Sequence, residues 1–253
     1  MTATFKRSGF STGKRPSTLV LLAAGAGSRL GRRPIPKAWL PVRGLPLVYR
    51  NLRLFCGAGI QRVIFVTGRL HERWPSLLGR LRHAWPCSFL LIHNARWCCT
   101  ENGDSLRLVE PYVKGLDEFL FAMADHLFSP EQVAMVLQTP AHPLTVRLVV
   151  DPQPGPWIDV EEATRVQFAS GRILAIGKGL VPWDAVDTGL FRASPRIFRY
   201  FPTRRQGIGV TEVIQRVAQA EQAGVLVVPG TRWTDLDTPV DWARAEALVA
   251  GTG

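Results

Sequence analysis

The pattern of apolar and polar residues over the first 150 positions alternates between two kinds of segment. Short apolar runs, typical of buried strands, cover residues 18–23, 61–67, 88–92, 118–123 and 145–150. Segments with the helical spacing of apolar residues lie between these runs, at about 45–57, 70–83, 103–115 and 130–138. This alternation predicts an α/β fold with a Rossmann-like, mixed but mainly parallel sheet and helices on both faces.

The pattern changes in the second half of the chain. Two short strand patterns, 163–168 and 171–176, are joined by Ser170-Gly171 and predict a hairpin. Further strands are predicted at 185–192 and 225–228, and a helix at 239–250. We therefore expect a small β-rich subregion laid on the same sheet. The predicted organisation is a disordered basic tail (1–16) and one domain (17–250), whose two halves are residues 17–140 and 141–250.

Charge changes this picture only slightly. The 253-residue chain has a formal net charge of +11, but its Lys and Arg residues form only short clusters such as Arg32-Arg33 and Arg204-Arg205. No segment is dense in basic residues and no nucleic-acid motif is present, so anionic small molecules are the expected partners, not nucleic acid. The sequence also contains no apolar run of about 18 residues, so no membrane span is expected.

The basic N-terminal segment lacks the apolar stretch of a secretory signal. The four cysteines, at positions 56, 87, 98 and 99, lack a Cys-x-x-Cys spacing. We expect free thiols in a reducing compartment and a cytoplasmic protein.

A glycine-rich loop follows directly on the first predicted strand. Gly25 and Gly27 can take backbone angles that other residues avoid, and they let phosphate oxygens approach the backbone amides closely. Arg29 closes the loop and can grip a phosphate with two hydrogen bonds, while Lys37, after Pro36, supplies a compact charge. The sequence thus predicts a nucleoside triphosphate site. The predicted nucleotide-binding residues of this region are Ala23, Ala24, Gly25, Ala26, Gly27, Ser28, Arg29 and Lys37.

Other interpretations of the loop fit less well. A dinucleotide fingerprint needs a glycine where Leu30 stands, and its glycine comes one place late at Gly31. A Walker loop needs Gly-Lys-Ser/Thr at its end, which is absent. A tight turn without a ligand needs neither the arginine nor the Pro-Lys pair. The nucleotidyltransferase signature, Ala-Ala-Gly-x-Gly-x-Arg-Leu followed by Pro-Lys, fits at every position.

A second candidate site lies where the strand at 118–123 ends in Asp125-His126. Ligands of open α/β sheets bind at the carboxyl ends of strands, and a carboxylate there can hold Mg²⁺. The alternative role for Asp125 is a helix cap or turn residue. His126 can contact a phosphate, or it can cap or pack.

Two further aspartates, Asp235 and Asp237, precede the helix predicted at 239–250. Either could supply a second carboxylate to a Mg²⁺ site shared with Asp125. The structural alternative is that Asp237 or Thr238 caps the helix; both cannot do so.

These motifs, in this order, resemble the sugar-phosphate nucleotidyltransferase superfamily, and most closely the inositol-1-phosphate cytidylyltransferases. The likeness covers about residues 17–250 and includes the stretches 101–106, 158–164, 176–178 and 186–189. It implies a Mg²⁺-dependent enzyme that uses CTP and a phosphorylated small alcohol, with a nucleotide-binding half (17–140) and an acceptor-binding half (141–250). A homodimer is a further possible assembly.

The resemblance implies a role for each matching residue. Arg29, Lys37 and Lys178 would be the catalytic cations, and Asn102, Gly103 and Ser105 would lie by the pyrimidine and ribose. Mg²⁺ would bind to Asp125 with Asp235 or Asp237. The implied acceptor-binding residues are Asp125, His126, Glu162, Lys178, Asp187, Thr188 and Gly189.

The implied reaction needs no general base, because a phosphate monoester oxygen that attacks the α-phosphorus is already anionic. Alignment and neutralisation of charge are what the site must provide.

Some positions depart from the family pattern. Ala124 replaces the usual glycine before the metal aspartate, Asp104 stands where relatives often have an aromatic residue, and the proline-rich segment 140–157 is individual. Relatives usually continue into a membrane-embedded CDP-alcohol phosphotransferase domain, which could receive the product, whereas this sequence stops at Gly253.

Three hypotheses for the function follow from the resemblance. In the leading one, the acceptor is inositol 1-phosphate or a similar polyol phosphate. A phosphonate, a phosphocholine-like compound or a sugar 1-phosphate is the second hypothesis, and a non-catalytic nucleotide-binding module is the third.

Overall fold

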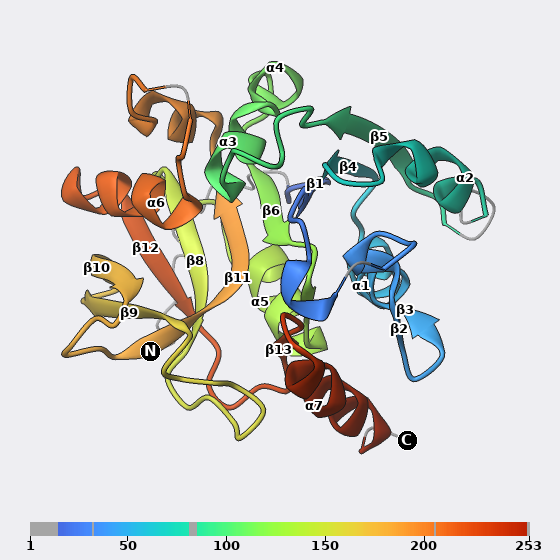
Figure 1. Ribbon diagram of the computed structural model, residues 1–253. Coiled ribbons are helices and arrows are strands. Elements are labelled where there is room, and N and C mark those ends of the chain that lie inside the picture. The colour runs from blue at the N-terminus through green and yellow to red at the C-terminus, as the bar shows by residue number, and fades with distance from the viewer. Residues whose placement is uncertain (1–14, 32, 81–84, 205, 252–253) are drawn as a thin grey trace, which may run out of the picture.

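One nine-stranded sheet forms the centre of the computed structural model, which describes residues 15–31, 33–80, 85–204 and 206–251 (Figure 1). The strand order is β5-β4-β1-β6-β11-β8-β12-β10-β9. Its first four strands are parallel: β5 (Ser88–His93), β4 (Arg62–Thr67), β1 (Thr18–Ala23) and β6 (Phe119–Met123). Because parallel neighbours all end at the same sheet edge, the segments that follow β1 and β6 meet there.

The second half of the sheet is mostly antiparallel. Strand β11 (Ala185–Ala193) runs against both β6 and β8 (Val146–Asp151), whereas β12 (Ala223–Val227) runs parallel to β8. The predicted hairpin forms as β9 (Thr164–Ala169) and β10 (Arg172–Lys178), with positive φ at Ser170 and Gly171. Strand β9 also pairs with β11. The expected mixed α/β sheet is confirmed.

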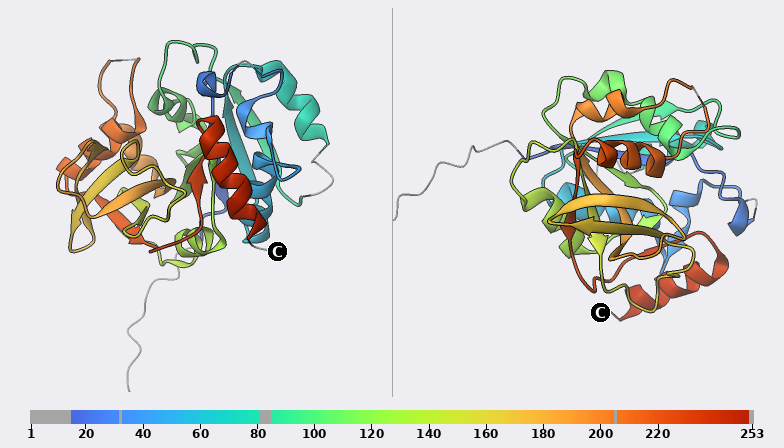
Figure 2. Two further views of the ribbon diagram at one scale, coloured as in Figure 1. Left: turned by 60° about the horizontal axis from the view of Figure 1, so that its bottom comes forward. Right: turned by 90° about the vertical axis from the view of Figure 1, so that its left-hand side faces the viewer.

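Helices cover both faces of the sheet (Figure 2), and alternate apolar side chains of β1 pack against the helices of each face. Leu19 and Leu21 pack with helices α1 (Leu47–Gly57), α2 (Trp74–Gly79) and α5 (Pro130–Gln138). Val20 and Leu22 point to the opposite face, against α3 (Asn102–Arg107), α4 (Glu110–Val113) and α6 (Val210–Gln219). A strand buried on both sides reads as a continuous apolar run, which is why its position was predictable.

Some predicted helices differ from the structure. The segment expected as one helix at 70–83 is a 3₁₀ turn, His71–Arg73, followed by α2, and residues 81–84 lie outside the described part. The helix expected at 103–115 is two short helices, and Pro111 stands in the first turn of the second, where its missing N–H is harmless. Helix α6 was not predicted. Helix α7 (Pro239–Ala250) has the predicted bounds.

Short strand pairs bring distant segments to the sheet edge. Strand β7 (His126–Leu127) pairs with β13 (Thr234–Asp235), so that Asp235 stands opposite His126. Strands β2 (Pro41–Val42) and β3 (Leu45–Pro46) form a second small pair. Helix α7 packs on this region through Ala245 and Leu248, which share an apolar cluster with Leu127.

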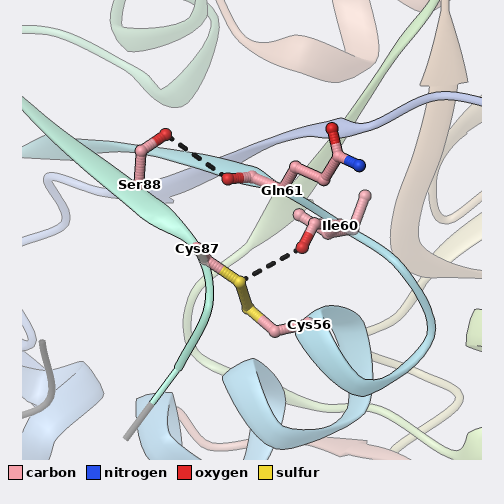
Figure 3. The surroundings of a disulfide bond; sticks show 5 residues. All are labelled: Cys56, Ile60, Gln61, Cys87 and Ser88. Atoms are coloured by element: carbon pink, nitrogen blue, oxygen red, sulfur yellow. Dashed lines mark hydrogen bonds between the residues drawn. A yellow bond between two sulfur atoms is a disulfide. The ribbon is translucent and has the colours of Figure 1, made fainter. Parts of the chain in front are cut away.

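The cysteines differ from the sequence expectation. Cys56, at the end of α1, and Cys87, just before β5, form a disulfide, so the prediction of four free thiols is wrong for this pair (Figure 3). Cys98 and Cys99 are free and exposed. The predicted disordered tail, 1–16, falls outside the described residues up to position 14. Within the described ranges, no helix is long and apolar enough to cross a membrane.

Candidate active site

A cleft of about 810 Å³ lies at the carboxyl ends of β1 and β6. Its lining contains most of the residues predicted from the sequence. These are Ala24, Gly25, Ala26, Gly27, Ser28, Arg29, Lys37, Asn102, Ser105, Asp125, His126, Glu162, Lys178, Asp187, Gly189, Asp235 and Asp237. Ala23, Gly103 and Thr188 do not line the cleft. The fold therefore brings together segments that lie more than 200 positions apart in the chain.

The glycine-rich loop leaves β1 and ends in a 3₁₀ turn, Ser28–Leu30. Gly27 has a left-handed backbone, with φ of 64°. A Cβ at Gly27 would lie 3.4 Å from the Cβ of Lys37, so the stem of Lys37 runs directly beside the loop. Lys37 begins a second 3₁₀ turn whose next residues, Ala38 and Trp39, are buried. Burial of these neighbours fixes the direction in which the Lys37 side chain leaves the backbone.

The acidic residues reach the cleft through the β7–β13 pair. Asp125 occupies the turn between β6 and β7, and its carbonyl accepts a hydrogen bond from the backbone N–H of Leu236 at 2.9 Å. The Asn51 side chain donates to the carbonyl of His126 at 2.7 Å and so ties the same turn to α1. These bonds hold Asp125 and His126 beside Asp235 and Asp237.

Helix capping, the structural alternative for two of these aspartates, is performed by other residues. Thr238 caps α7: its hydroxyl accepts from the N–H of Asp241, and the Asp241 carboxylate accepts from the N–H of Thr238 at 2.8 Å. Ser129 caps α5 in the same way. The carboxylates of Asp125 and Asp237 are consequently available to the cleft.

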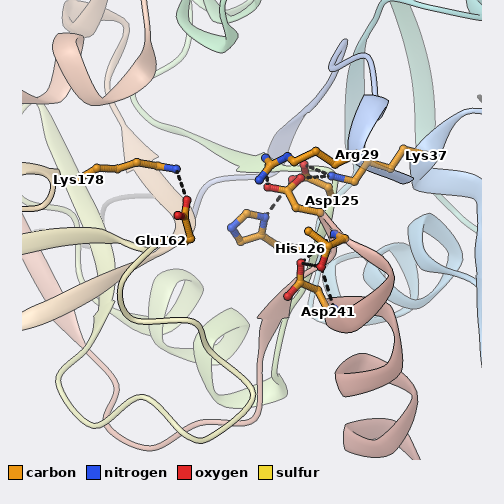
Figure 4. Close-up of polar contacts among 9 residues, drawn as sticks. Arg29, Lys37, Asp125, His126, Glu162, Lys178 and Asp241 are labelled. Atoms are coloured by element: carbon orange, nitrogen blue, oxygen red, sulfur yellow. Dashed lines mark hydrogen bonds and ion pairs between the residues drawn. The ribbon is translucent and has the colours of Figure 1, made fainter. Parts of the chain in front are cut away.

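Both predicted triphosphate-binding cations form ion pairs with these carboxylates (Figure 4). Lys37 Nζ lies 2.8 Å from Asp125 Oδ2 and 2.5 Å from Asp237 Oδ1. Arg29 Nη2 lies 2.5 Å from Asp237 Oδ2. Burial disfavours the charged ammonium, yet the two carboxylates outweigh it and raise the pKa of Lys37.

His126 lies between Asp125 and Trp233. Its Nδ1 lies 3.0 Å from Asp125 Oδ1, and its ring stacks near Trp233. Burial lowers the pKa of His126, but Asp125, Asp235 and Asp187 together raise it above the ordinary value. Burial opposes ionisation of Asp125, and Lys37 and His126 overcome it, holding the Asp125 pKa far below its usual range.

Two further carboxylates at the cleft have raised pKa values. Burial raises the pKa of Asp187 to about 6, against the opposing hydrogen bond from the N–H of Gly189 and the charge of His126. Burial also raises the pKa of Asp235, helped by the nearby charges of Asp125, Asp237 and Asp241 and opposed by His126. Within the part of the chain that the structure describes, no hydrogen bond or ion pair reaches the Asp235 side chain.

The unpaired carboxylate of Asp235, close to two other carboxylates, fits a cation with oxygen ligands. The described residues contain no group of three or more His, Cys, Asp or Glu side chains arranged to hold a metal ion by themselves. Mg²⁺ is commonly bound by one or two carboxylates together with substrate phosphates and water. The donor set therefore fits the predicted cation as a site completed by the nucleotide.

The predicted pyrimidine end of the cleft is built around the start of α3. The Asn102 Oδ1 accepts from the N–H of Val210 at 2.8 Å, and its amide nitrogen donates to the sulfur of Met123 at 3.9 Å. Ser105 is buried and accepts from the side chain of Asn94 at 3.1 Å. Gly103 lies against backbone, since a Cβ there would approach the Ile208 carbonyl to 2.5 Å. Its role is close packing of α3.

The opposite wall carries Lys178 at the end of β10 (Figure 4). Its ammonium lies 3.6 Å from the Glu162 carboxylate, and both side chains are largely exposed. The Thr188 side chain is buried and donates to the carbonyl of Val149 at 2.8 Å, so it supports β11 instead of lining the cleft.

Sequence reasoning missed several lining residues. Asn94 and Trp97 follow β5, and Asp159 precedes β9. Arg244 of α7 lies 3.2 Å from Asp241. Asn94 could have been found by the rule that singled out Asp125, since it also follows a strand that ends at this edge. Arg244 gave no such signal, because it looks like an ordinary surface residue of a helix.

Comparisons with known proteins agree with this geometry. The profile of a family described as MobA-like NTP transferase domain matches residues 19–160. The chain is 31% identical over 239 residues to the bifunctional IPC transferase and DIPP synthase of Thermococcus kodakarensis, covering 94% of this chain and 51% of that protein. It is 30% identical to the protein of the same name from Aquifex aeolicus, and the match covers 93% of this chain and 52% of that protein. The chain thus spans about half the length of these relatives.

Solved structures show the same fold. The inositol-1-phosphate CTP transferase from T. maritima superposes with a TM-score of 0.81 at 22% identity, covering 94% of this chain and 98% of that one. A UDP-glucose pyrophosphorylase complexed with UDP-glucose superposes with a TM-score of 0.76 at 17% identity, and the match covers 94% of this chain and 100% of that one.

Proposed function

The chain belongs to the MobA-like NTP transferase domain family and is a nucleotidyltransferase, and we propose that it transfers CMP from CTP to a phosphorylated polyol. Inositol 1-phosphate or a similar compound is the proposed acceptor, and pyrophosphate is the second product. The names of the relatives from Thermococcus kodakarensis and Aquifex aeolicus, IPC transferase, support this choice.

The observation that carries the proposal is the placement of cations on two walls of one cleft. Arg29 and Lys37 stand beside the glycine-rich loop, and Lys178 stands across the cleft beyond His126 (Figure 4). Two anionic substrates can therefore enter from opposite sides and meet between the walls. The proposed roles are triphosphate binding for Arg29 and Lys37, and acceptor-phosphate binding for Lys178.

In the proposed reaction, an oxygen of the acceptor phosphate forms a bond to the α-phosphorus of CTP, and the bond to pyrophosphate breaks. The nucleophile is already ionised, so the cleft needs to align the two phosphates and offset their repulsion. A Mg²⁺ ion held by Asp125 with Asp235 or Asp237 would supply positive charge at the triphosphate. The pyrimidine would lie by Asn102 and Ser105.

The acceptor end supports a polyol because it is rich in hydrogen-bond acceptors. Glu162 pairs with the cation Lys178, and Asp159 and Asp187 line the same cleft. Carboxylates accept hydrogen bonds from hydroxyl groups, while a cation holds the phosphate. We propose that the CDP-polyol product then passes to a CDP-alcohol phosphotransferase.

A pyrophosphate-release assay tests the proposal, with four nucleoside triphosphates crossed against inositol 1-phosphate, phosphocholine, a phosphonate and a sugar 1-phosphate. We expect CTP with inositol 1-phosphate to give the highest kcat/KM. A preference for GTP by tenfold, or about 1.4 kcal/mol, would contradict the cytidylyl assignment. Preference for another acceptor would replace the polyol.

A further inference from the structure

The cations proposed to receive the triphosphate are already occupied in the free protein. Asp237 alone engages both of them, with one oxygen on Lys37 and the other on Arg29, each at 2.5 Å. Asp125 takes a second hydrogen of the Lys37 ammonium at 2.8 Å. Because an ammonium has three N–H donors, Lys37 keeps only one for a phosphate oxygen while these contacts last.

The pair of Lys37 with Asp237 is partly buried, whereas the Arg29 side chain in the second pair is 58% exposed. The Lys37 side chain is 12% exposed and that of Asp237 is 27% exposed, so solvent screens the pair weakly. Breaking the pairs without compensation would leave two ionised carboxylates partly buried beside each other, which is costly.

Asp235 provides the contrast. It stands in the same cleft, two positions before Asp237, but among the described residues no cation pairs with its side chain. The chain therefore offers two nearby carboxylates, one bound to both triphosphate cations and one bound to neither.

A triphosphate and the Asp237 carboxylate compete for the same N–H donors. If CTP enters alone, Lys37 and Arg29 must leave Asp237, and the bare carboxylates then repel the incoming phosphates. If a divalent cation binds to the carboxylates, it replaces the positive charge of Lys37 and Arg29 and releases both for the nucleotide.

We propose that Asp237 couples nucleotide binding to cation binding by holding Arg29 and Lys37 until a divalent cation takes their place. This inference rests on the proposed function, in which Arg29 and Lys37 bind the triphosphate. The coupling is reciprocal, so CTP strengthens cation binding by the same factor by which the cation strengthens CTP binding. Asp237 is thus a positioning residue for the two cations in the free protein.

The test is equilibrium binding of CTP to the full chain by calorimetry, in EDTA and in saturating Mg²⁺. We expect Asp237→Asn to bind CTP about tenfold more tightly than the wild type in EDTA, because Arg29 then loses its carboxylate partner and Lys37 keeps only Asp125. The factor by which Mg²⁺ strengthens CTP binding should be smaller in Asp237→Asn than in the wild type by a similar amount. If Asp237 were only a metal ligand, its loss would leave CTP affinity in EDTA unchanged.

Asp235→Asn is the matched control, since it removes one negative charge from the same cleft without freeing a cation. Its CTP affinity in EDTA should change by less than about threefold, the residual effect of one nearby charge. Thr238 and Asp241 cap α7, so Asp237→Asn should leave the start of the helix intact. Asp237→Ser is a second variant, and its CTP affinity in EDTA should rise as that of Asp237→Asn does.

If Asp235→Asn and Asp237→Asn raise CTP affinity in EDTA equally, the coupling is overturned and a general effect of charge is indicated. Unchanged or weaker binding by both Asp237 variants would also overturn it. Failure of the wild type to bind CTP even in Mg²⁺ would instead contradict the proposed function and remove the inference with it.

Discussion

Replacing Asp187 with Asn should stabilise the protein at neutral pH and leave it little changed in acid. Burial raises the pKa of this carboxyl to about 6 from its ordinary 3.8. The folded state therefore favours the protonated form, and the ionised form destabilises it. The stability associated with the proton is fully present below pH 3.8 and is lost as the pH rises through 6.

The magnitude follows from the two pKa values. One pKa unit corresponds to about 1.36 kcal/mol, so full ionisation of Asp187 costs at most about 3 kcal/mol. Between pH 4.5 and pH 8, linkage predicts a change of about 2 kcal/mol in the stability of the variant relative to the wild type. The asparagine oxygen can still accept the hydrogen bond from the Gly189 N–H, which is 2.7 Å long with aspartate, so the turn should survive.

Urea unfolding of both proteins at the two pH values measures this change, with Asp117→Asn, at an exposed aspartate, as the control. The free energy of unfolding of Asp187→Asn minus that of the wild type should be larger at pH 8 than at pH 4.5. A difference that is the same at both pH values would refute the reasoning, as would a variant less stable than the wild type at pH 8.

Three further changes give distinct outcomes. Asp125→Asn should keep the fold and lower turnover by about two to three orders of magnitude, the scale of losing one key electrostatic group; near-normal turnover at limiting Mg²⁺ would contradict a ligand role. Lys178→Ala should raise the acceptor KM and leave CTP affinity unchanged, and weaker CTP binding with normal acceptor kinetics would place it on the other substrate. Gly189→Ala would bring a Cβ within 2.7 Å of the His126 ring, so it should lower the melting temperature more than Gly171→Ala, which has similar φ but open space; equal losses would contradict the clash.

Helices, strands and motifs that are determined by residues close together in the sequence could be predicted. The glycine-rich loop and Asp125 follow strands that are buried on both faces, and such strands stand out as apolar runs. Helix α6 could also have been predicted, because Val210, Val213, Ile214 and Val217 carry the helical spacing and are all buried. The two short helices α3 and α4 were harder to predict, since Pro111 stands in the first turn of α4 without disturbing the apolar pattern.

Features that depend on contacts between distant residues could not be predicted. The disulfide joins Cys56 and Cys87 across 31 positions, and nothing in their local sequence marks them as partners. The pairs of Lys37 with Asp125 and Asp237 span 88 and 200 positions. Motif reasoning selected all three residues as ligands of substrate or metal. It could not show that they bind one another in the free protein.

The choice between Asp235 and Asp237 illustrates the difference. The two residues are two positions apart in one short motif, so residue type cannot separate their roles. The structure separates them through their neighbours. Thr238 caps α7 and so frees Asp237 from that role, and the β7–β13 register sets Asp235 opposite His126 while Asp237 reaches Arg29 and Lys37. A divalent cation approaching the cleft would meet an unpaired carboxylate at Asp235, whereas at Asp237 it must first displace two cations. The two aspartates are therefore unequal in the free protein, and matched substitutions should affect nucleotide binding in different ways.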